Sequence, residues 1–456
     1  MQTLAQLKAG ELLGVTSLQL VENLVEFPRE IFELADTLEI LDLSNNQLDS
    51  LPDDFARLKR LKILFASNNR FDTLPAVLGQ CPALEMIGFK ANQISRVPAS
   101  SLPQQTRWLI LTDNCISELP DTLGQLHRLQ KLALAGNRLT SLPETMANCR
   151  NLELVRLSAN ALDALPNWLL QLPKLSWLAF AGNPFSHTLN DLHADVKGVL
   201  NVTLSDISLG EKLGEGASGI IYRGDWINHQ LIQNTKTTAI AVKLFKGEVT
   251  SDGYPADELD CCLTTGMHPN LIKVLAHISE PEQLGLVMEL IPNGFSNLGL
   301  PPSLVSCTRD TFKEGSHFSF DAVIKIALQL ADAMAHMHAK HISHGDVYAH
   351  NMMIDKDNRL LFGDFGAASN LAKLSDSERL AMESIEVRAL GCLIDDLLAF
   401  VDRAADPECF EKLSGLAAQT MQANLSCRPR FTGIKHALAL MSESNLWFDS
   451  DKISGI

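Results

Sequence analysis

Residues 38–48 read LEILDLSNNQL, and residues 129–139 repeat the same frame as LQKLALAGNRL. In both stretches apolar residues recur every second or third position and lead to an asparagine, Asn46 or Asn137. The asparagine returns every 23 residues, with one interval of 22, at Asn23, Asn46, Asn69, Asn92, Asn114, Asn137, Asn160 and Asn183. A fixed period of this length predicts a stack of similar units, each of which buries the apolar face of its neighbour.

The frame can be written L-x-x-L-x-L-x-x-N-x-L, and an x-L-P step often follows it. Its alternating part predicts a short strand, and the asparagine side chain can satisfy backbone groups in the turn that follows. Eight such units, from residue 15 to about residue 190, resemble the leucine-rich-repeat family. The resemblance implies an α/β solenoid with a parallel sheet on its concave side.

The strand positions that point out of the solenoid form an apolar stripe, because alternate strand residues face opposite sides of a sheet. The stripe comprises Ile63, Phe65, Met86, Trp108, Leu154 and Trp177, flanked by Ile40, Ile110 and Lys131. A large exposed apolar surface usually marks an interaction site. We expect the stripe to bind a protein substrate or regulator, or to dock the second domain of the same chain. The third interpretation is that the stripe consists of ordinary exposed hydrophobic residues that bind nothing.

The sequence changes character after residue 205, where LGEGASGIIYRG at 213–224 contains Gly214, Gly216 and Gly219. Glycines allow backbone N–H groups to approach phosphate oxygens closely. This spacing alone would also suit an ordinary turn between two strands. The interpretation as a nucleotide loop therefore depends on the residues that follow.

Lys243 favours the nucleotide interpretation, because it lies within the apolar strand-like segment IAVKLF, where an unpaired charge is costly. Glu258, on a predicted helix, could pair with Lys243 and orient it towards the α and β phosphates.

Further motifs follow in the order found in protein kinases. LGLVMELIPNG at 284–294 resembles the fifth strand and hinge of that family, HGDVYAHN at 344–351 its catalytic loop, and GDFG at 363–366 its metal-binding motif. The resemblance extends from about residue 207 to 440 and implies an α+β bilobal domain. We therefore expect a leucine-rich-repeat domain at 1–205, cap included, and a protein-kinase-like domain at 206–456.

The resemblance to protein kinases implies a role for each motif residue and two cofactors, ATP and Mg²⁺. Asp346, Lys243 and Glu258 are the expected catalytic residues, and Asn351 and Asp364 the expected metal ligands. The residues expected to bind ATP are Gly214, Gly216, Gly219, Ile221, Lys243, Met288, Glu289 and Ile291. The implied activity is an ATP-dependent protein kinase directed at serine and threonine.

The acceptor side of the site departs from the protein-kinase pattern. Gly345 stands where the family often has the arginine that receives an activation-loop phosphate, and Tyr348 where serine/threonine kinases usually have a lysine. Ala349 and His350 do not match the tyrosine-kinase pattern either. A shortened segment follows Asp364, and the Ala-Pro-Glu motif is missing. A small-molecule phosphotransferase and a scaffold with an inactive kinase domain therefore remain open alternatives.

The composition of the chain indicates which partners it would exclude and which cellular compartment would suit it. The net charge of −16 would repel nucleic acid. Nine cysteines without disulfide-like or metal-ligand spacing favour reduced thiols and a cytoplasmic location. The first residues lack the pattern of a signal peptide, and no apolar run is long enough to predict a membrane span.

Overall fold

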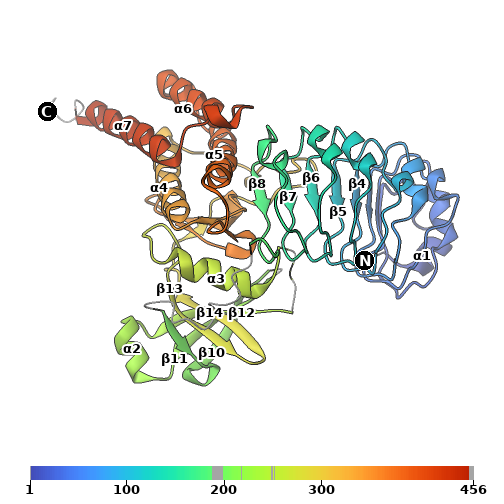
Figure 1. The fold of residues 1–456 in the computed structure, drawn as a ribbon, viewed down its shortest axis with the longest axis horizontal. Helices are drawn as coiled ribbons and strands as arrows, with labels where there is room; N and C mark the ends of the chain where they lie inside the picture. Colours follow the sequence, from blue (N-terminus) through green and yellow to red (C-terminus); the bar gives the residue numbers. More distant parts are fainter. Residues whose placement is uncertain (1, 187–198, 217, 248–249, 251, 451–456) are drawn as a thin grey trace. The chain divides into compact units, whose positions relative to one another are not determined.

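A computed structural model describes residues 2–186, 199–216, 218–247, 250 and 252–450. The chain divides into two compact units (Figure 1). Unit 1 comprises Met1–Leu175 and Gly182–Phe185, and unit 2 comprises Ser176–Ala181 and Ser186–Ile456.

The boundaries of these units differ from the expected domain ranges 1–205 and 206–456, which stay a prediction. Ser176–Ala181, a segment of the eighth repeat, groups with unit 2. Strand β9 (Leu200–Val202) pairs with a strand of that unit as well. Most of the predicted cap between Pro184 and Asp206 lies outside the described residues.

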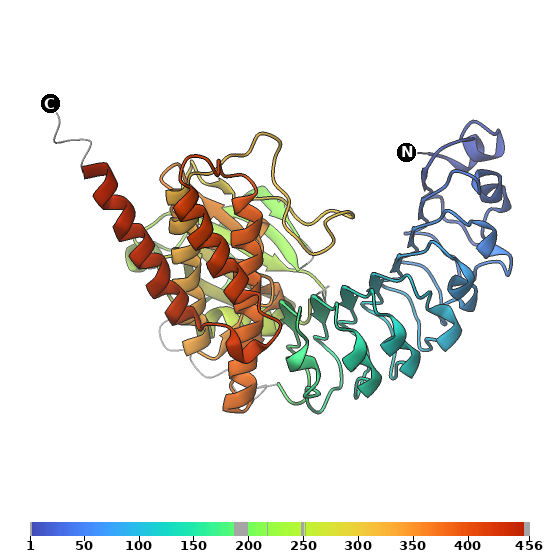
Figure 2. The same ribbon diagram turned by 90° about the horizontal axis from the view of Figure 1, so that it is seen from above.

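Unit 1 is a curved stack of repeats, with short strands on the inner side of the curve and 3₁₀ helices on the outer side (Figure 2). A short helix, α1 (Leu4–Lys8), precedes the first repeat, and its first turn is capped by the side chain of Thr3. The strands are β1 (Ser17–Gln19), β2 (Ile40–Asp42), β3 (Ile63–Phe65), β4 (Met86–Gly88), β5 (Trp108–Ile110), β6 (Lys131–Ala133) and β7 (Leu154–Arg156). The 3₁₀ helices are η1 (Arg29–Leu34), η2 (Phe55–Arg57), η3 (Ala76–Gln80), η4 (Ala99–Ser101), η5 (Asp121–Gln125), η6 (Glu144–Asn148) and η7 (Leu169–Gln171).

The parallel register of these strands follows the sequence period, as in the pairs Ile40 with Ile63 and Trp108 with Lys131. A proline precedes five of the seven 3₁₀ helices, at Pro28, Pro75, Pro98, Pro120 and Pro143. Its fixed φ angle directs the chain into each tight outer turn.

The repeat asparagines from Asn46 to Asn160 form a ladder of buried or half-buried amides. The Asn137 amide nitrogen donates to the carbonyl oxygens of Leu111 and Leu134, each at 2.9 Å, and its oxygen accepts the N–H of Ile116 at 3.0 Å. Each amide thus bonds to the backbone of its own repeat and of the preceding one. The predicted fold class of this half is confirmed.

The apolar stripe is less exposed than we expected. Of the six residues, Ile63, Met86, Trp108, Leu154 and Trp177 are buried and Phe65 is half-buried. Neighbouring strands pack these side chains together. The ring of Phe65 lies over Gly88, where a β-carbon would approach it to 2.6 Å, and the Lys131 ammonium lies 4.7 Å from the Trp108 ring centre. The prediction of an exposed stripe is therefore wrong.

Unit 2 begins with a six-stranded sheet in the order β10-β11-β12-β14-β13-β9. Its strands are β9, β10 (Ile207–Glu215), β11 (Gly219–Trp226), β12 (Ala239–Phe245), β13 (Val274–Glu280) and β14 (Gln283–Glu289), with helices α2 (His229–Thr235) and α3 (Pro255–Thr265). The buried faces of these strands share a core that includes Ile240, Val242, Ile278 and Val287.

The rest of unit 2 is mainly helical, as Figure 1 shows. Its helices are α4 (Phe320–Ala339), α5 (Asp376–Leu398), α6 (Pro407–Thr420) and α7 (Phe431–Ser450). Short strands frame the loops between them: β15 (Ser296–Asn297), β16 (Ile342–Ser343), β17 (Met352–Ile354), β18 (Leu360–Phe362) and β19 (Ser369–Asn370). The remaining 3₁₀ turns are η8 (Leu204–Asp206), η9 (Ala349–Asn351), η10 (Phe365–Ala367) and η11 (Leu425–Cys427). The predicted α+β class of the second half is confirmed.

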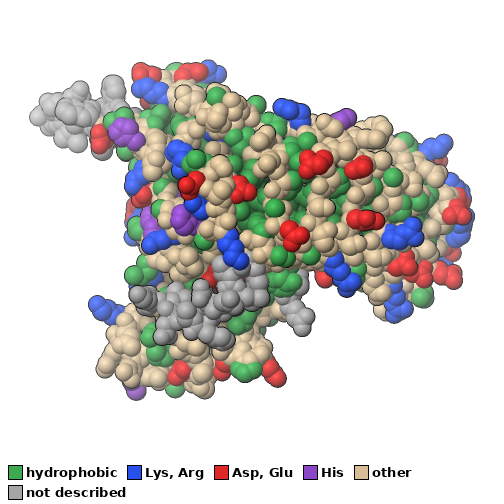
Figure 3. Space-filling view, in the orientation of Figure 1, with side chains coloured by type: hydrophobic (Ala, Val, Ile, Leu, Met, Phe, Trp, Pro, Cys, Tyr) green, Lys and Arg blue, Asp and Glu red, His purple; other side chains and the backbone are tan. Residues whose placement is uncertain are grey.

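Two further observations concern membrane-spanning helices and the distribution of charged side chains on the surface. None of the helices formed by the described residues combines the length and apolar character of a membrane-spanning segment. On the face drawn in Figure 3, acidic and basic side chains are interspersed rather than gathered into one basic patch.

Candidate active site

The glycine turn between β10 and β11 covers one end of a cavity of about 310 Å³. A β-carbon on Gly219 would lie 2.5 Å from the Leu244 carbonyl oxygen, so glycine is required for the approach of β11 to β12. Gly214 and Gly216, in contrast, would meet nothing within 4 Å. Gly216 lines the cavity, so the turn leaves space there into which a phosphate chain could fit.

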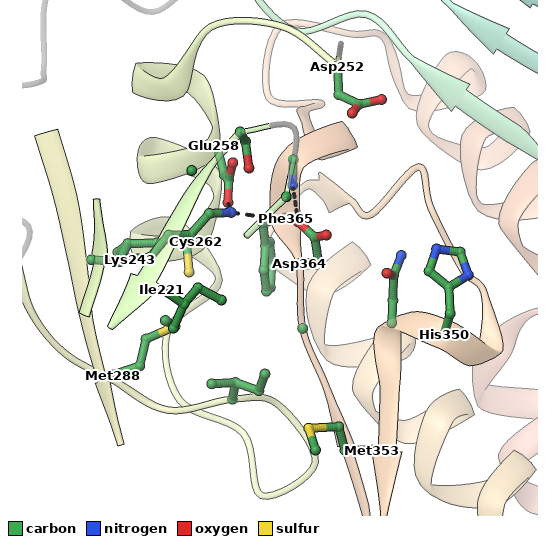
Figure 4. A pocket seen from close by; sticks show the side chains of 18 of the residues that line it. Ile221, Lys243, Asp252, Glu258, Cys262, Met288, His350, Met353, Asp364 and Phe365 are labelled. Atoms are coloured by element: carbon green, nitrogen blue, oxygen red, sulfur yellow. Dashed lines mark hydrogen bonds and ion pairs between the residues drawn. The ribbon is translucent and has the colours of Figure 1, made fainter. Parts of the chain in front are cut away.

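Lys243 and Glu258 form a buried ion pair between β12 and α3. Figure 4 shows the two side chains pointing at one another, with Asp364 beside them. Burial opposes the charge on Lys243, but the carboxylates of Glu258 and Asp364 outweigh this effect and raise the pKa of the ammonium group. Lys243 is therefore held as a cation at the wall of the cavity.

Asp364 occupies a special backbone position. Its φ of 62° is left-handed, and its carboxylate oxygen accepts the N–H of Gly366 at 3.4 Å. The same oxygen lies 3.7 Å from the Lys243 ammonium, while more than half of the side chain is exposed. Phe365 is buried behind it. The acid is thus turned to the cavity by a local backbone bend and remains accessible to a ligand.

Asp346 and Asn351 are joined directly. The Asn351 amide donates to the Asp346 carboxylate at 2.7 Å and to the Asp346 carbonyl oxygen at 3.0 Å. The five-residue interval read from the sequence therefore closes into one hydrogen-bonded loop. Asn351 lines the cavity, and its contact fixes the orientation of the acid.

The loop that carries Asp346 is anchored by an acid on α5. One oxygen of Glu386 accepts the N–H groups of His344 and Gly345, at 2.8 and 2.6 Å. Burial lowers the pKa of His344, so its ring stays neutral. His344 accepts the N–H of Asp346 at Nδ1, which leaves the proton on Nε2, 3.0 Å from the Gly363 carbonyl oxygen. Glu386 thus fixes the backbone of the loop just before Asp346.

A second acid, Asp310, was not identified from the sequence. Its carboxylate accepts the N–H of Ala349 at 2.9 Å. The pKa of Asp310 is raised to about 8, mainly by burial and also by the charges of Asp396 and Asp346. No sequence pattern indicates this contact, because Asp310 lies in an irregular segment before α4.

The cavity brings together most of the predicted residues. It is lined by Gly216, Gly219, Ile221, Lys243, Glu258, Met288, Ile291, Asn351 and Asp364. Gly214, Glu289 and Asp346 are outside this lining, and Glu289 is exposed at the end of β14. Figure 4 shows Ile221 and Met288 on one side and His350 on the other.

Sequence reasoning missed several lining residues: Ser218, Asp252, Cys262, Ile272, Leu286, Asn297, His350, Met353 and Phe365. Leu286 could have been found by strand alternation, since it lies two residues from Met288 on β14. Asp252 and Ile272 lie in connecting segments without a distinctive pattern.

The segment after Asp364 is as short as the sequence indicated. In this fully described stretch only η10 and β19 precede α5. Glu383 pairs with Arg430 and accepts the N–H of Phe431 at 3.0 Å, and Arg428 donates to the carbonyl oxygens of Gln422 and Ser384.

The donor set fits Mg²⁺ bound together with phosphate. Asp364 and Asn351 offer oxygen ligands, which this ion prefers, and Mg²⁺ usually takes only one or two protein ligands alongside phosphate oxygens. The described residues contain no cluster of three or more His, Cys, Asp or Glu side chains that could hold a metal alone.

Two family models match the chain. The model described as protein tyrosine and serine/threonine kinase matches residues 207–392, and the leucine rich repeat model matches residues 14–71 and 127–185.

Curated relatives match less than half of the chain. Fibroblast growth factor receptor 1 of Xenopus laevis is 24% identical over 200 residues, which are 42% of this chain and 25% of the relative. A probable serine/threonine-protein kinase of Dictyostelium discoideum is 26% identical over 229 residues, 46% of this chain and 40% of the relative. The tyrosine-protein kinase transmembrane receptor Ror of Drosophila melanogaster is 29% identical over 185 residues, 40% of this chain and 25% of the relative.

The matched segments thus cover less than half of each relative, and the relatives include both serine/threonine and tyrosine kinases. The matches agree with the repeat ladder and with the arrangement of Lys243, Glu258, Asp346, Asn351 and Asp364. This chain joins leucine-rich repeats to a protein kinase domain in one polypeptide.

Proposed function

We propose that the chain is an active, ATP- and magnesium-dependent protein kinase that phosphorylates serine and threonine. The observation that carries the proposal is the grouping of Lys243, Glu258, Asn351 and Asp364 around one cavity, with Asp346 held by Asn351 at its edge. A domain that had lost catalysis would have no need to keep this arrangement.

Each residue has a part in phosphoryl transfer, a reaction controlled mainly by positioning and charge neutralisation. Lys243, kept cationic by its two acidic neighbours, binds the phosphate chain beneath the glycine turn. Ile221, Met288 and Ile291 enclose the adenine, with Glu289 at the end of β14 in the adjoining hinge. Asp346 accepts the proton of the acceptor hydroxyl, and Asn351 keeps its carboxylate aimed at that hydroxyl.

Asp364 and Asn351 are the proposed ligands of Mg²⁺, which when bound neutralises charge on the β and γ phosphates. The exposed carboxylate of Asp364 supports this role, since a metal ligand must be accessible from the cavity.

A hydroxyl on a protein is the proposed acceptor, because the chain carries repeats of a class suited to protein recognition. The preference for serine and threonine follows the family resemblance alone, because the loop departs from the serine/threonine pattern at Tyr348 and from the tyrosine-kinase pattern at Ala349 and His350. We further propose that the repeats select the substrate or a regulator. A reducing, cytoplasmic location would suit the cysteines, all nine of which are free thiols in the described residues.

The test is transfer of labelled γ-phosphate from ATP to a mixture of proteins, followed by identification of the phosphorylated amino acid. We expect phosphoserine and phosphothreonine from the wild type and no transfer from Lys243→Met or Asp364→Asn. Lys325→Met and Asp321→Asn, which change exposed residues of α4, serve as matched controls and should transfer normally.

Each alternative predicts a different result. Tight ATP binding without any transfer would replace the proposal with a scaffold function. Transfer to small alcohols but not to proteins would indicate a small-molecule phosphotransferase. Transfer that persists in both Lys243→Met and Asp364→Asn would disprove the assignment of the site.

A further inference from the structure

Strand β8 (Trp177–Ala179) has the frame of a repeat, but it belongs to the same compact unit as the kinase domain. Trp177 occupies the position that Trp108 and Leu154 occupy in other repeats. Its side chain is 2% exposed, and its neighbours are residues of the catalytic loop rather than solvent.

Trp177 contacts the catalytic loop in two ways. Its indole N–H donates to the carbonyl oxygen of Val347 at 3.0 Å, and Val347 directly follows Asp346. Its ring stacks on Tyr348, with ring centres 4.6 Å apart and planes 8° from parallel. Tyr348 is itself 3% exposed, so both stacked rings are buried and the stacking holds Tyr348 in place within the loop.

The backbone of β8 and of the residue after it also reaches the segment beyond the Asp-Phe-Gly motif. The N–H of Phe180 donates to the hydroxyl of Ser369 at 3.0 Å, and Ser369 lies on β19, which pairs with β16 just before the catalytic loop.

Gly345, which precedes Asp346, also lies close to the backbone of β8. A β-carbon on Gly345 would lie 3.0 Å from the Leu178 carbonyl oxygen and 2.4 Å from that of Ala367. The space in which an arginine side chain would begin is therefore occupied by backbone from both segments.

We propose that β8 is a built-in clamp for the catalytic loop, with Trp177 as a positioning residue for Asp346. The proposal rests on the proposed kinase function. In kinases with an arginine next to the catalytic aspartate, that arginine can be ordered by an activation-loop phosphate. Here the indole and the backbone of β8 hold the same loop, and no phosphate is required.

The clamp predicts a specific kinetic effect, because loss of alignment lowers the rate of transfer without changing the nucleotide cavity. In Trp177→Phe, which keeps an aromatic ring but loses the N–H donor, we expect kcat to fall about tenfold while KM for ATP is unchanged. Trp177→Ala should lower kcat further. Trp168→Phe is the matched control, since Trp168 lies in the preceding repeat, in unit 1, and its buried N–H has no partner among the described residues.

Two additional measurements separate positioning from general damage. Amide hydrogen exchange in residues 344–351 should accelerate in Trp177→Phe and remain unchanged in Trp168→Phe. Phosphatase treatment of the wild type should leave kcat within about twofold, because no phosphate orders the loop.

The outcomes are distinguishable. An unchanged kcat in both Trp177 variants, or a loss of wild-type activity after phosphatase treatment, would overturn the clamp. A wild-type protein without any transfer would instead refute the proposed function, and hydrogen exchange at 344–351 would still test the clamp alone.

Discussion

The carboxylate of Asp310 accepts the N–H of Ala349 across 2.9 Å, so a second acid holds the loop that carries Asp346. Burial is the main reason that the pKa of Asp310 rises to about 8. The neighbouring charges of Asp396 and Asp346 act in the same direction, and the Ala349 N–H opposes them.

This raised pKa predicts how stability depends on pH. Between about pH 4, near the pKa of an aspartate in the unfolded chain, and about pH 8, folded Asp310 binds a proton that the unfolded chain does not. Its contribution to the free energy of unfolding therefore falls as the pH rises through this range. Asp310→Asn can still accept the N–H of Ala349 but cannot ionise, so the variant should gain stability relative to wild type from pH 5 to pH 8.

Urea unfolding of both proteins at several pH values measures this difference. Asp321→Asn changes an exposed acid and should follow the wild-type profile. Parallel profiles for Asp310→Asn and wild type would show that Asp310 is ionised in the folded protein.

Gly345→Ala should destabilise the kinase unit for two separable reasons. The φ of 73° is unfavourable for alanine, and the new β-carbon would lie 2.4 Å from the Ala367 carbonyl oxygen. Gly315→Ala also places alanine at an unfavourable φ, 77°, but its new β-carbon would meet nothing within 4 Å. We expect a loss of roughly 1 kcal/mol for Gly315→Ala and roughly 3 kcal/mol for Gly345→Ala in urea unfolding. Equal losses would show that the backbone contact at Gly345 relaxes freely.

The glycine turn offers a similar contrast. Gly219→Ala should reduce stability by about 1 to 3 kcal/mol, because the added carbon would press on the Leu244 carbonyl. Gly216→Ala has open space, so its stability should stay within about 0.5 kcal/mol of wild type. Since Gly216 lines the cavity, that variant should bind ATP more weakly, as titration calorimetry can measure. Wild-type ATP affinity in Gly216→Ala would argue against a phosphate site at this turn.

In the repeats, Asn137→Ala removes three hydrogen bonds to buried backbone groups. We expect roughly 3 kcal/mol of destabilisation in urea unfolding followed by circular dichroism. Asn151→Ala, in the next repeat, loses exposed contacts and should change stability by less than about 0.5 kcal/mol. If the two variants behaved alike, the ladder would contribute little to stability.

The features that could be predicted from the sequence are those with a short-range or periodic signature. The 23-residue recurrence of asparagine requires a stack, because each amide must reach the backbone of the preceding unit. Lys243 in an apolar strand implies an anionic partner, and the five residues from Asp346 to Asn351 suffice to close one loop.

The features that could not be predicted depend on contacts distant in the sequence. Trp177 has the pattern of an outward repeat residue, and only the folded chain brings Val347 to its indole N–H. Asp310 is in an irregular segment, so nothing local indicates that it reaches Ala349. The stripe was expected to be exposed because alternation gives the face on which a side chain lies but not how closely its neighbours pack.

Strand β8 also sets a limit on how the protein can be divided. A recombinant kinase that began at residue 207, where the family match begins, would lack Trp177 and the N–H of Phe180, and its catalytic loop would lose both supports. A fragment that began at residue 176 would keep both supports. Given the proposed kinase activity and the proposed clamp, cleavage between residue 181 and residue 207 would separate Trp177 from the catalytic loop and would lower transfer rather than raise it.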